Sequence, residues 1–179
     1  MSSIRRSAGN RIILMIDRTG GFNYDGFYDW VATHRSGIFI EIGSFRGGST
    51  AYLAERSEAI IFAVDTFQPY EINGELISDT FEYFLRNTTH VREKINILKM
   101  TSVEASKLFL PVFDFIFIDA AHDYESVKKD IEVWLPKLKS NGILAGHDYC
   151  EKFPGVMKAV QEAGFEYTII GDVWVMNNF

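Results

Sequence analysis

From Gly37 onward, short apolar runs alternate with amphipathic stretches, and this alternation leaves few folds open to the chain. Strands that alternate with helices form parallel βαβ units. Strands that are apolar along their whole length need a sheet covered on both faces. We therefore predict an α/β fold in three layers, with one mostly parallel sheet between two layers of helices. The predicted strands are residues 38–42, 60–64, 95–98, 115–118 and 143–145, and the predicted helices are 49–58, 79–87, 124–138 and 155–163. The Asn141-Gly142 pair is predicted to end the third of these helices.

The two ends of the chain depart from this alternation. Residues 167–170 and 173–176 are separated by a Gly-Asp pair, which predicts a closing antiparallel hairpin. Residues 1–36 are interpreted as an N-terminal extension, with a short helix at 24–33 beside the site. The domain proper is predicted to span residues 37–179, and a chain of 179 residues suits one domain with a sizeable core.

Charge and composition disfavour several classes of protein. The formal net charge of −6 argues against a nucleic-acid partner, because phosphate binding needs a basic surface. The apolar run from Ile12 to Ile16 is too short for a membrane span or a secretory signal, so we expect no membrane partner. The single cysteine, Cys150, excludes an internal disulfide and a multi-cysteine zinc site, and it suits a cytoplasmic protein.

Polar side chains stand where four of the predicted strands end. In parallel sheets, ligands bind at the carboxyl ends of the strands, where the strand order reverses. Each of these side chains alone is a weak signal, and their equivalent positions on successive strands predict one site. The four strand ends carry Glu41-Ile42-Gly43, Asp65, Asp119 and His147-Asp148.

The first strand end opens a glycine-rich turn, and its residues predict a bound adenosyl group. Glycine lets the backbone approach a ligand, and the helix that follows offers free N–H groups to a carboxylate. Phe45 breaks the dinucleotide-binding pattern, and no Gly-Lys-Ser/Thr triplet follows for a P-loop. Asp65, at the end of the next strand, is placed to accept both hydroxyls of a ribose. A plain tight turn and a solvated Asp65 are the alternatives.

The other two strand ends favour a divalent metal beside a general base. Asp119 and Asp148 offer hard oxygen ligands, and His147 is a further candidate ligand. A metal there would lower the pKa of a substrate hydroxyl, and His122 could accept its proton. In the alternative interpretation, Asp119 holds the ammonium group of the cofactor and His147 is a hydrogen-bonded core residue.

Together these residues resemble the class I S-adenosylmethionine-dependent methyltransferases. Within that family the chain is similar to the metal-dependent small-molecule O-methyltransferases of the macrocin O-methyltransferase type. The resemblance runs from about Gly37 to the C-terminus, and its most specific part is the stretch from Ile118 to Glu125. It implies a Rossmann-like three-layer sandwich with a seven-stranded sheet whose last strand is antiparallel. Further matching positions are Asp130, Trp134-Leu135, Leu138, Asn141-Gly142 and His147-Asp148-Tyr149.

The resemblance also implies a role for each site residue. Asp119 is implied as catalytic, cofactor-binding and metal-ligating, and His122 as the catalytic base. Asp148 matches a metal-ligand position, and His147 stands where relatives often carry an acid, which departs from the usual ligand set. The implied cofactor-binding residues are Glu41, Gly43, Ser44 and Ser49 at the turn, Asp65 and Thr66 at the ribose, and Thr101 and Ser102 at the adenine.

The expected activity is O-methylation of a small-molecule hydroxyl with S-adenosylmethionine as cofactor and Mg²⁺ or another divalent metal as helper. A substrate lid would come from residues 1–36 or 67–87, and a homodimer is a further expectation. Two other activities stay open at this point, a nucleotide-cofactor oxidoreductase and metal-dependent hydroxylation on a methyltransferase-like fold. A binding protein that keeps the cofactor pocket without turnover is a third alternative.

Overall fold

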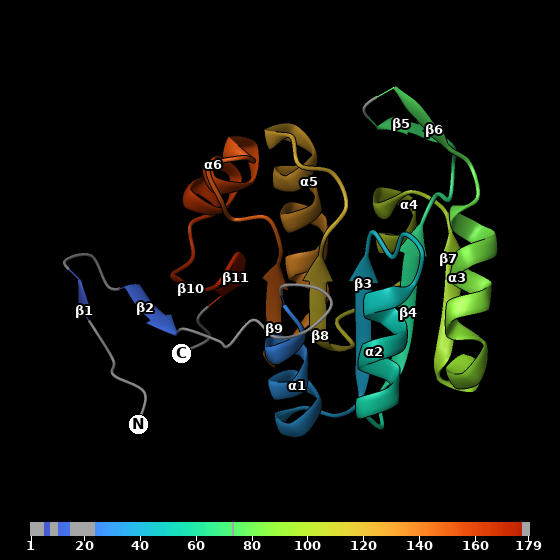
Figure 1. Ribbon diagram of the computed structural model, residues 1–179. Coiled ribbons are helices and arrows are strands. Elements are labelled where there is room, and N and C mark those ends of the chain that lie inside the picture. The colour runs from blue at the N-terminus through green and yellow to red at the C-terminus, as the bar shows by residue number, and fades with distance from the viewer. Residues whose placement is uncertain (1–5, 8–10, 15–23, 73, 177–179) are drawn as a thin grey trace.

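The computed structural model describes residues 6–7, 11–14, 24–72 and 74–176. Its main sheet has the strand order β1-β2-β10-β11-β9-β8-β3-β4-β7, and Figure 1 shows its central strands side by side. The strands that carry the site argument are β3 (Ile38–Ile42), β4 (Ile60–Asp65), β7 (Ile95–Lys99), β8 (Phe113–Ile118), β9 (Leu138–Gly146), β10 (Tyr167–Ile170) and β11 (Val173–Met176). The helices are α1 (Asp25–His34), α2 (Gly48–Arg56), α3 (Thr80–Thr88), α4 (Ser102–Ser106), α5 (Tyr124–Trp134) and α6 (Pro154–Glu162), with 3₁₀ turns η1 (Thr89–Lys94) and η2 (Leu135–Lys137).

The predicted seven-stranded, mostly parallel sheet is confirmed. Strands β7, β4, β3, β8 and β9 are parallel neighbours, and β11 lies antiparallel between β9 and β10. Two short strands that the sequence did not predict, β1 (Arg6–Ser7) and β2 (Arg11–Leu14), extend the sheet beyond β10. The strand order reverses between β3 and β8, which is where a ligand is expected to bind.

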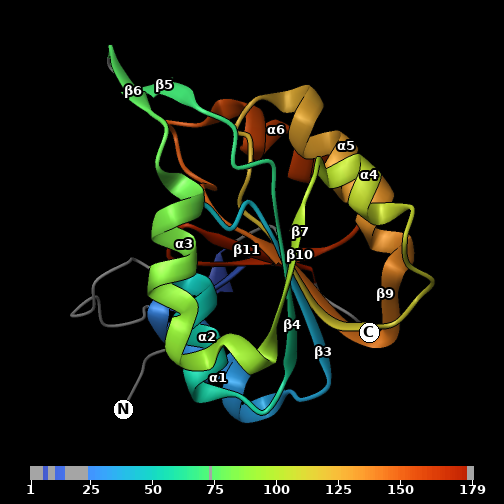
Figure 2. The ribbon, with the colours of Figure 1, turned by 90° about the vertical axis from the view of Figure 1, so that its right-hand side faces the viewer.

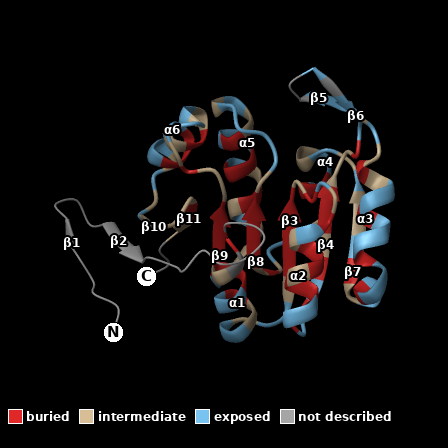
Figure 3. Cartoon of the chain, in the orientation of Figure 1, coloured by how far each residue is buried: buried red, intermediate tan, exposed pale blue. Residues whose placement is uncertain are grey.

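Helices cover both faces of the sheet, as Figure 2 shows in an edge-on view. Successive side chains of a strand point to opposite faces, and β8 divides its apolar residues accordingly. Phe115 and Phe117 belong to the core beneath α1, α2 and α3, whereas Ile116 and Ile118 belong to the core beneath α5 and α6. The continuous apolar run predicted a sheet buried on both sides, and Figure 3 shows the buried residues concentrated on these strands.

The helix predicted for residues 24–33 is present as α1, and it belongs to the main core. Phe27, Tyr28 and Val31 are fully buried and lie in one cluster with Phe115 and Phe117 of β8. The extension predicted for residues 1–36 therefore contributes an integral helix to one layer. Residues 1–5, 8–10 and 15–23 lie outside the described residues, and the predicted lid role of this segment is a proposal.

The helix predicted to reach Leu138 is too long, and Asn141-Gly142 does not end it. Helix α5 stops at Trp134, Pro136 starts a 3₁₀ turn, and Leu138 is already paired with Phe113 in β9. Proline removes a backbone donor, so the α-helical ladder cannot continue through it. Gly142 lies inside β9 at a register shift, where an added Cβ would stand 2.9 Å from the carbonyl oxygen of Phe113. Gly142 therefore lies at a β-bulge and does not end a helix as predicted.

Two small elements at the carboxyl end of the sheet were not predicted. The hairpin of β5 (Tyr70–Ile72) and β6 (Glu75–Ile77) rises above that end in Figure 1. Helix α4 follows β7 and opens with a capping box between Thr101 and Glu104. Among the described residues, no helix has the length and apolar character needed to cross a membrane.

Candidate functional site

A cavity of about 960 Å³ opens at the carboxyl ends of β3, β4, β7 and β8. This is the edge at which the sequence placed the site, and the side chains come from the loops that follow these strands. Tyr24, from the turn before α1, lines the cavity with them. The predicted site residues that line it are Gly43, Ser44, Ser49, Asp65, Thr66, Ser102, Asp119 and His122.

The turn after β3 is held against the neighbouring strand ends by backbone contacts. Gly43 has a φ of 90°, and an added Cβ would lie 2.2 Å from the carbonyl oxygen of Asp119. The amides of Gly43 and Ser44 donate to the carbonyl of Val64 at 2.8 and 3.2 Å. Only glycine fits this approach without displacing the backbone of Asp119. The turn and the end of β8 therefore meet at a fixed distance.

Asp65 is held by two backbone amides from opposite sides. The N–H of Phe45 donates to its Oδ2 at 2.9 Å, and the N–H of Phe67 donates to its Oδ1 at 2.7 Å. Both phenylalanines have positive φ values, 45° and 50°, which is uncommon for non-glycine residues. Each carboxylate oxygen has a further lone pair, so the residue can still accept from a ligand in the cavity.

Glu41 lies beneath the turn and does not line the cavity. Its carboxylate is 1% exposed, and it accepts from the hydroxyl of Tyr28 at 2.7 Å and from that of Thr50. Burial raises the pKa of Glu41, and the hydrogen bonds from Thr50, Ser49 and Tyr28 oppose that rise. The structure places Glu41 behind the cavity, where it supports the first turn of α2, and its contact with the cofactor stays a prediction.

Thr101 and Ser102 are neighbours in the sequence, but only one of them lines the cavity. Thr101 is exposed and its hydroxyl donates to Glu104 at 2.7 Å, as part of the cap of α4. Ser102 is half-buried and lines the cavity. Of the two residues implied at the adenine, the structure therefore places only Ser102 at the cavity.

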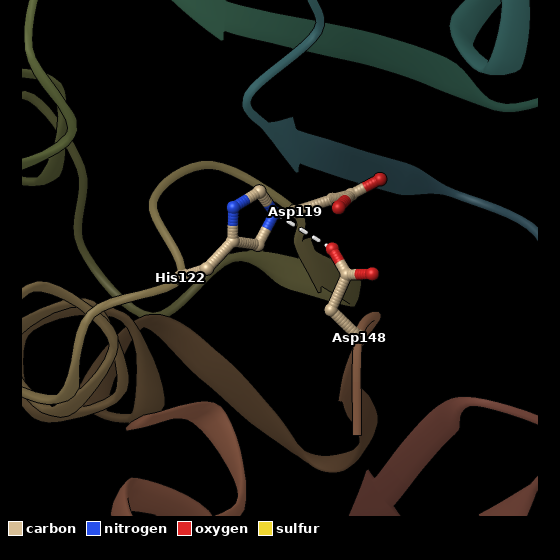
Figure 4. Close-up of side chains that lie close together, drawn as sticks. All are labelled: Asp119, His122 and Asp148. Atoms are coloured by element: carbon tan, nitrogen blue, oxygen red, sulfur yellow. Dashed lines mark ion pairs between the residues drawn. The ribbon is translucent and has the colours of Figure 1, made fainter. Parts of the chain in front are cut away.

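Asp119, His122 and Asp148 form a cluster, shown in Figure 4. Asp119 and His122 line the cavity, and Asp148 lies beside them without lining it. Each offers a ligand atom, and the three atoms lie within 4.8 Å of one another. His122 Nε2 stands 2.7 Å from Asp148 Oδ2. His147 was predicted as the third ligand beside the two aspartates, and in the described chain His122 completes the three-residue group instead. Nδ1 of His147 faces both carboxylates, at 3.6 Å from Asp119 Oδ1 and 3.3 Å from Asp148 Oδ1.

In this cluster the carboxylates favour protonation of the histidines, and the histidines favour ionisation of Asp148. Burial lowers the pKa of His147, but the hydrogen bonds to Asp119 and Asp148 outweigh it and raise the pKa to about 9. The hydrogen bond to Asp148 raises the pKa of His122. Burial opposes ionisation of Asp148, yet its two histidine partners hold its pKa below the usual range. At neutral pH the two aspartates therefore face a protonated His147, and a bound cation would compete with this imidazolium for the carboxylates.

Tyr24 is a site residue that sequence reasoning missed. Its hydroxyl donates to Asp119 Oδ2 at 3.1 Å, and its ring centroid lies 4.6 Å from that of His147. Burial is the main cause that raises the pKa of Tyr24, so the hydroxyl keeps its proton and remains a donor. The sequence placed a helix beside the site, but no local pattern distinguishes Tyr24 from the other aromatic residues of that segment.

The fold and the cavity define an α/β protein with a ligand site at the carboxyl edge of its parallel sheet. A family model described as a methyltransferase domain matches residues 40–149. The chain therefore belongs to this methyltransferase family, whose cofactor is S-adenosylmethionine.

Solved structures share the fold at low sequence identity. A protein from Klebsiella pneumoniae assigned as an O-methyltransferase is 16% identical with a TM-score of 0.67, over 89% of this chain and 82% of that one. A methyltransferase from Geobacter sulfurreducens is 12% identical with a TM-score of 0.65, over 90% and 78% of the two chains. The precorrin-6y C5,15-methyltransferase from Geobacter metallireducens GS-15 is 10% identical with a TM-score of 0.61, over 85% and 84%.

A curated relative adds sequence similarity without a known activity. The uncharacterized protein y4gI of Sinorhizobium fredii (strain NBRC 101917 / NGR234) is 30% identical over 88 residues. The match covers 49% of this chain and 10% of that protein, so the chain spans about a tenth of the length of this relative.

Proposed function

We propose that this protein transfers the methyl group of S-adenosylmethionine to a hydroxyl oxygen of a small molecule, assisted by a divalent metal. The cluster of Asp119, His122 and Asp148 beside the cofactor cavity carries this proposal. The carboxylates of Asp119 and Asp148 suit a hard divalent cation, and the imidazole of His122 beside them can act as a general base. The similarity to macrocin-type O-methyltransferases supports the same activity.

The cofactor would be held by residues at or just after the ends of three strands, β3, β4 and β7. Asp65 would accept from the ribose hydroxyls, and the free N–H groups at the start of α2, with Ser49, would bind the carboxylate of the methionine part. Ser102 would lie at the base. This arrangement holds the sulfonium toward Asp119, where the acceptor is expected, in a geometry suited to in-line attack.

The acceptor would lie between the cofactor and the cluster. Asp119 and Asp148 would hold the metal, and Nδ1 of His147 would orient both carboxylates. A metal there lowers the pKa of a bound hydroxyl. His122 accepts the hydroxyl proton at an imidazole nitrogen, and its hydrogen bond to Asp148 fixes the ring. Tyr24 keeps Asp119 in place from the side of α1.

The remaining expectations are part of the proposal. The net charge of −6 supports a small-molecule acceptor over a nucleic acid. Tyr70 of the β5–β6 hairpin lines the cavity, which supports the lid role of residues 67–87. An N-terminal contribution to the lid and a homodimer are proposed on sequence grounds. The family match argues against the oxidoreductase alternative.

Methyl transfer is tested directly by product formation. Purified protein is incubated with S-adenosylmethionine and a panel of sugar and phenol acceptors, with Mg²⁺ or with EDTA, and S-adenosylhomocysteine is quantified. We expect release that needs both an acceptor and the metal. Acceptor-dependent release that survives EDTA would contradict the metal role. Tight binding of S-adenosylhomocysteine without turnover on any acceptor would favour the non-catalytic binding alternative.

The raised pKa values of the histidines predict how metal binding depends on pH. Ligand groups must lose their protons before a metal binds, and protonated imidazoles repel a cation. The affinity for Mg²⁺ should therefore rise as pH increases from 6, and level off above the pKa of His147, about 9. Calorimetry from pH 6 to 9.5 measures this, and His147→Asn should flatten the upper part of the curve. The matched control is His90→Asn, an exposed histidine of η1. A pH-independent affinity would count against the metal site.

A further inference from the structure

Two residues of α5 hold the hydroxyl of Ser102, at the side of the cavity that faces away from the metal cluster. Trp134 is fully buried and its Nε1–H donates to Ser102 Oγ at 2.8 Å. The hydroxyl of Ser102 in turn donates to Oδ1 of Asp130, which is 6% exposed. Asp130 and Trp134 belong to the motif that the sequence resemblance singled out, and the proposed mechanism gives neither of them a role.

The two partners fix the direction in which the hydroxyl can bond. An indole N–H only donates and an ionised carboxylate only accepts, while a serine hydroxyl has one hydrogen and two lone pairs. The hydrogen is therefore committed to Asp130, and Trp134 takes one lone pair. Burial raises the pKa of Asp130 to about 6, which still leaves it ionised at neutral pH. What remains for a ligand is a lone pair, so Ser102 can accept from the ligand and cannot donate to it.

The order of the strands shows which part of the ligand meets this acceptor. Across the carboxyl edge the order is β8, β3, β4 and β7, which carry Asp119, Gly43, Asp65 and Met100 in turn. With the ribose at Asp65 and the amino-acid part toward Asp119, the base extends toward Met100 and Ser102. The exocyclic 6-amino group of adenine is a hydrogen-bond donor, whereas the 6-oxo group of hypoxanthine is an acceptor.

We propose that Asp130 is a positioning residue that keeps Ser102 as a hydrogen-bond acceptor, so that the site selects a 6-aminopurine cofactor over its 6-oxopurine analogue. The inference rests on the proposed function, because it takes the ligand to be an adenosyl compound. A 6-oxo group would place its lone pairs against that of Ser102, with no hydrogen available between them. Asp130 supplies the selectivity, since it alone commits the hydrogen. Trp134 takes up one lone pair of the hydroxyl and leaves its hydrogen with Asp130, so Trp134→Phe serves as the matched control.

The test compares two ligands on four proteins. Calorimetry measures the dissociation constants of S-adenosylhomocysteine and S-inosylhomocysteine for the wild type and for Ser102→Ala, Asp130→Ala and Trp134→Phe. The wild type should bind the 6-amino ligand at least about tenfold more tightly, as expected for one hydrogen bond exchanged for a repulsive contact. In Asp130→Ala the freed hydroxyl hydrogen can turn to the 6-oxo group, so the ratio should fall about tenfold. Trp134→Phe keeps the bond to Asp130 and should keep the ratio.

The ratio separates this role from a purely structural one. A merely structural Asp130 would weaken both ligands equally and leave the ratio unchanged, which overturns the inference. If Asp130→Ala does not fold, Ser102→Ala must bring the ratio close to one, and a ratio that stays at the wild-type value overturns the inference. Equal wild-type affinity for both ligands overturns it too, while the proposed function stands. Failure of the wild type to bind either ligand overturns the proposed function as well.

Discussion

Replacing Asp65 by Ala is expected to weaken binding of S-adenosylhomocysteine by at least about 100-fold. Hydrogen bonds to a charged group contribute about 1.5–3 kcal/mol each, so two lost bonds to the ribose hydroxyls reach this range. The substitution also releases the amides of Phe45 and Phe67, which Asp65 holds at 2.9 and 2.7 Å. The variant therefore loses the contacts of Asp65 with the ligand and the two hydrogen bonds that hold the loops beside the cavity. Calorimetric titration with S-adenosylhomocysteine, with and without Mg²⁺, measures the loss.

Two further variants make that result specific. Asp65→Asn keeps one acceptor oxygen and should lose less affinity than Asp65→Ala. Glu93→Ala removes an exposed carboxylate of η1 and should bind as the wild type does. Wild-type affinity in Asp65→Ala would show that the ligand does not use this strand end, and the assignment of the cofactor site would have to be abandoned.

Replacing Asp148 is expected to abolish metal dependence and to lower methyl transfer by at least about 100-fold, while the affinity for S-adenosylhomocysteine changes little. Asp148 follows β9 and lies next to Asp119 and His122, whereas Asp65 ends β4 and Ser102 begins α4. Its φ of 59° favours Asn over Ala as the replacement, because Asn tolerates the left-handed conformation. Turnover at varied Mg²⁺ is compared for the wild type, Asp148→Asn and Asp148→Ala.

The Asn variant separates chemistry from folding. Asp148→Asn keeps an oxygen that can accept from His122, but it removes the negative charge that a cation needs. A variant with full, Mg²⁺-dependent activity would contradict the metal assignment. Cofactor affinity that falls as steeply as turnover would indicate a damaged fold, and the thermal melting temperature distinguishes this case from loss of the metal.

The sequence predicts the sheet well because its signals are local. An apolar run between turn residues is enough to indicate a buried strand, and β3, β4 and β8 follow this pattern. The same local logic fails at residues 135–142. The prediction overlooked Pro136, a local signal that ends the α-helix before Leu138. The apolar character of Leu138 does not show that a strand begins there, and its pairing with Phe113 does.

The site is predictable to the extent that the strand ends specify it. Parallel strands bring Gly43, Asp65, Asp119 and Asp148 to one edge, whatever the connecting helices do. Contacts from distant elements lie beyond such reasoning. Glu41 looks like a cavity residue until Tyr28 of α1 covers it, and Tyr24 reaches Asp119 only because α1 lies over β8. Neither contact has a signature in the local sequence.

The contact between Gly43 and the backbone of Asp119 couples the proposed cofactor site to the proposed metal site. One glycine Cα rests against the carbonyl of the residue that faces the metal end, with no space for a methyl group between them. A shift of the cofactor turn must therefore move the carboxylate that orients the acceptor. Any side chain introduced at position 43 is therefore expected to disturb the cofactor turn and the metal end together.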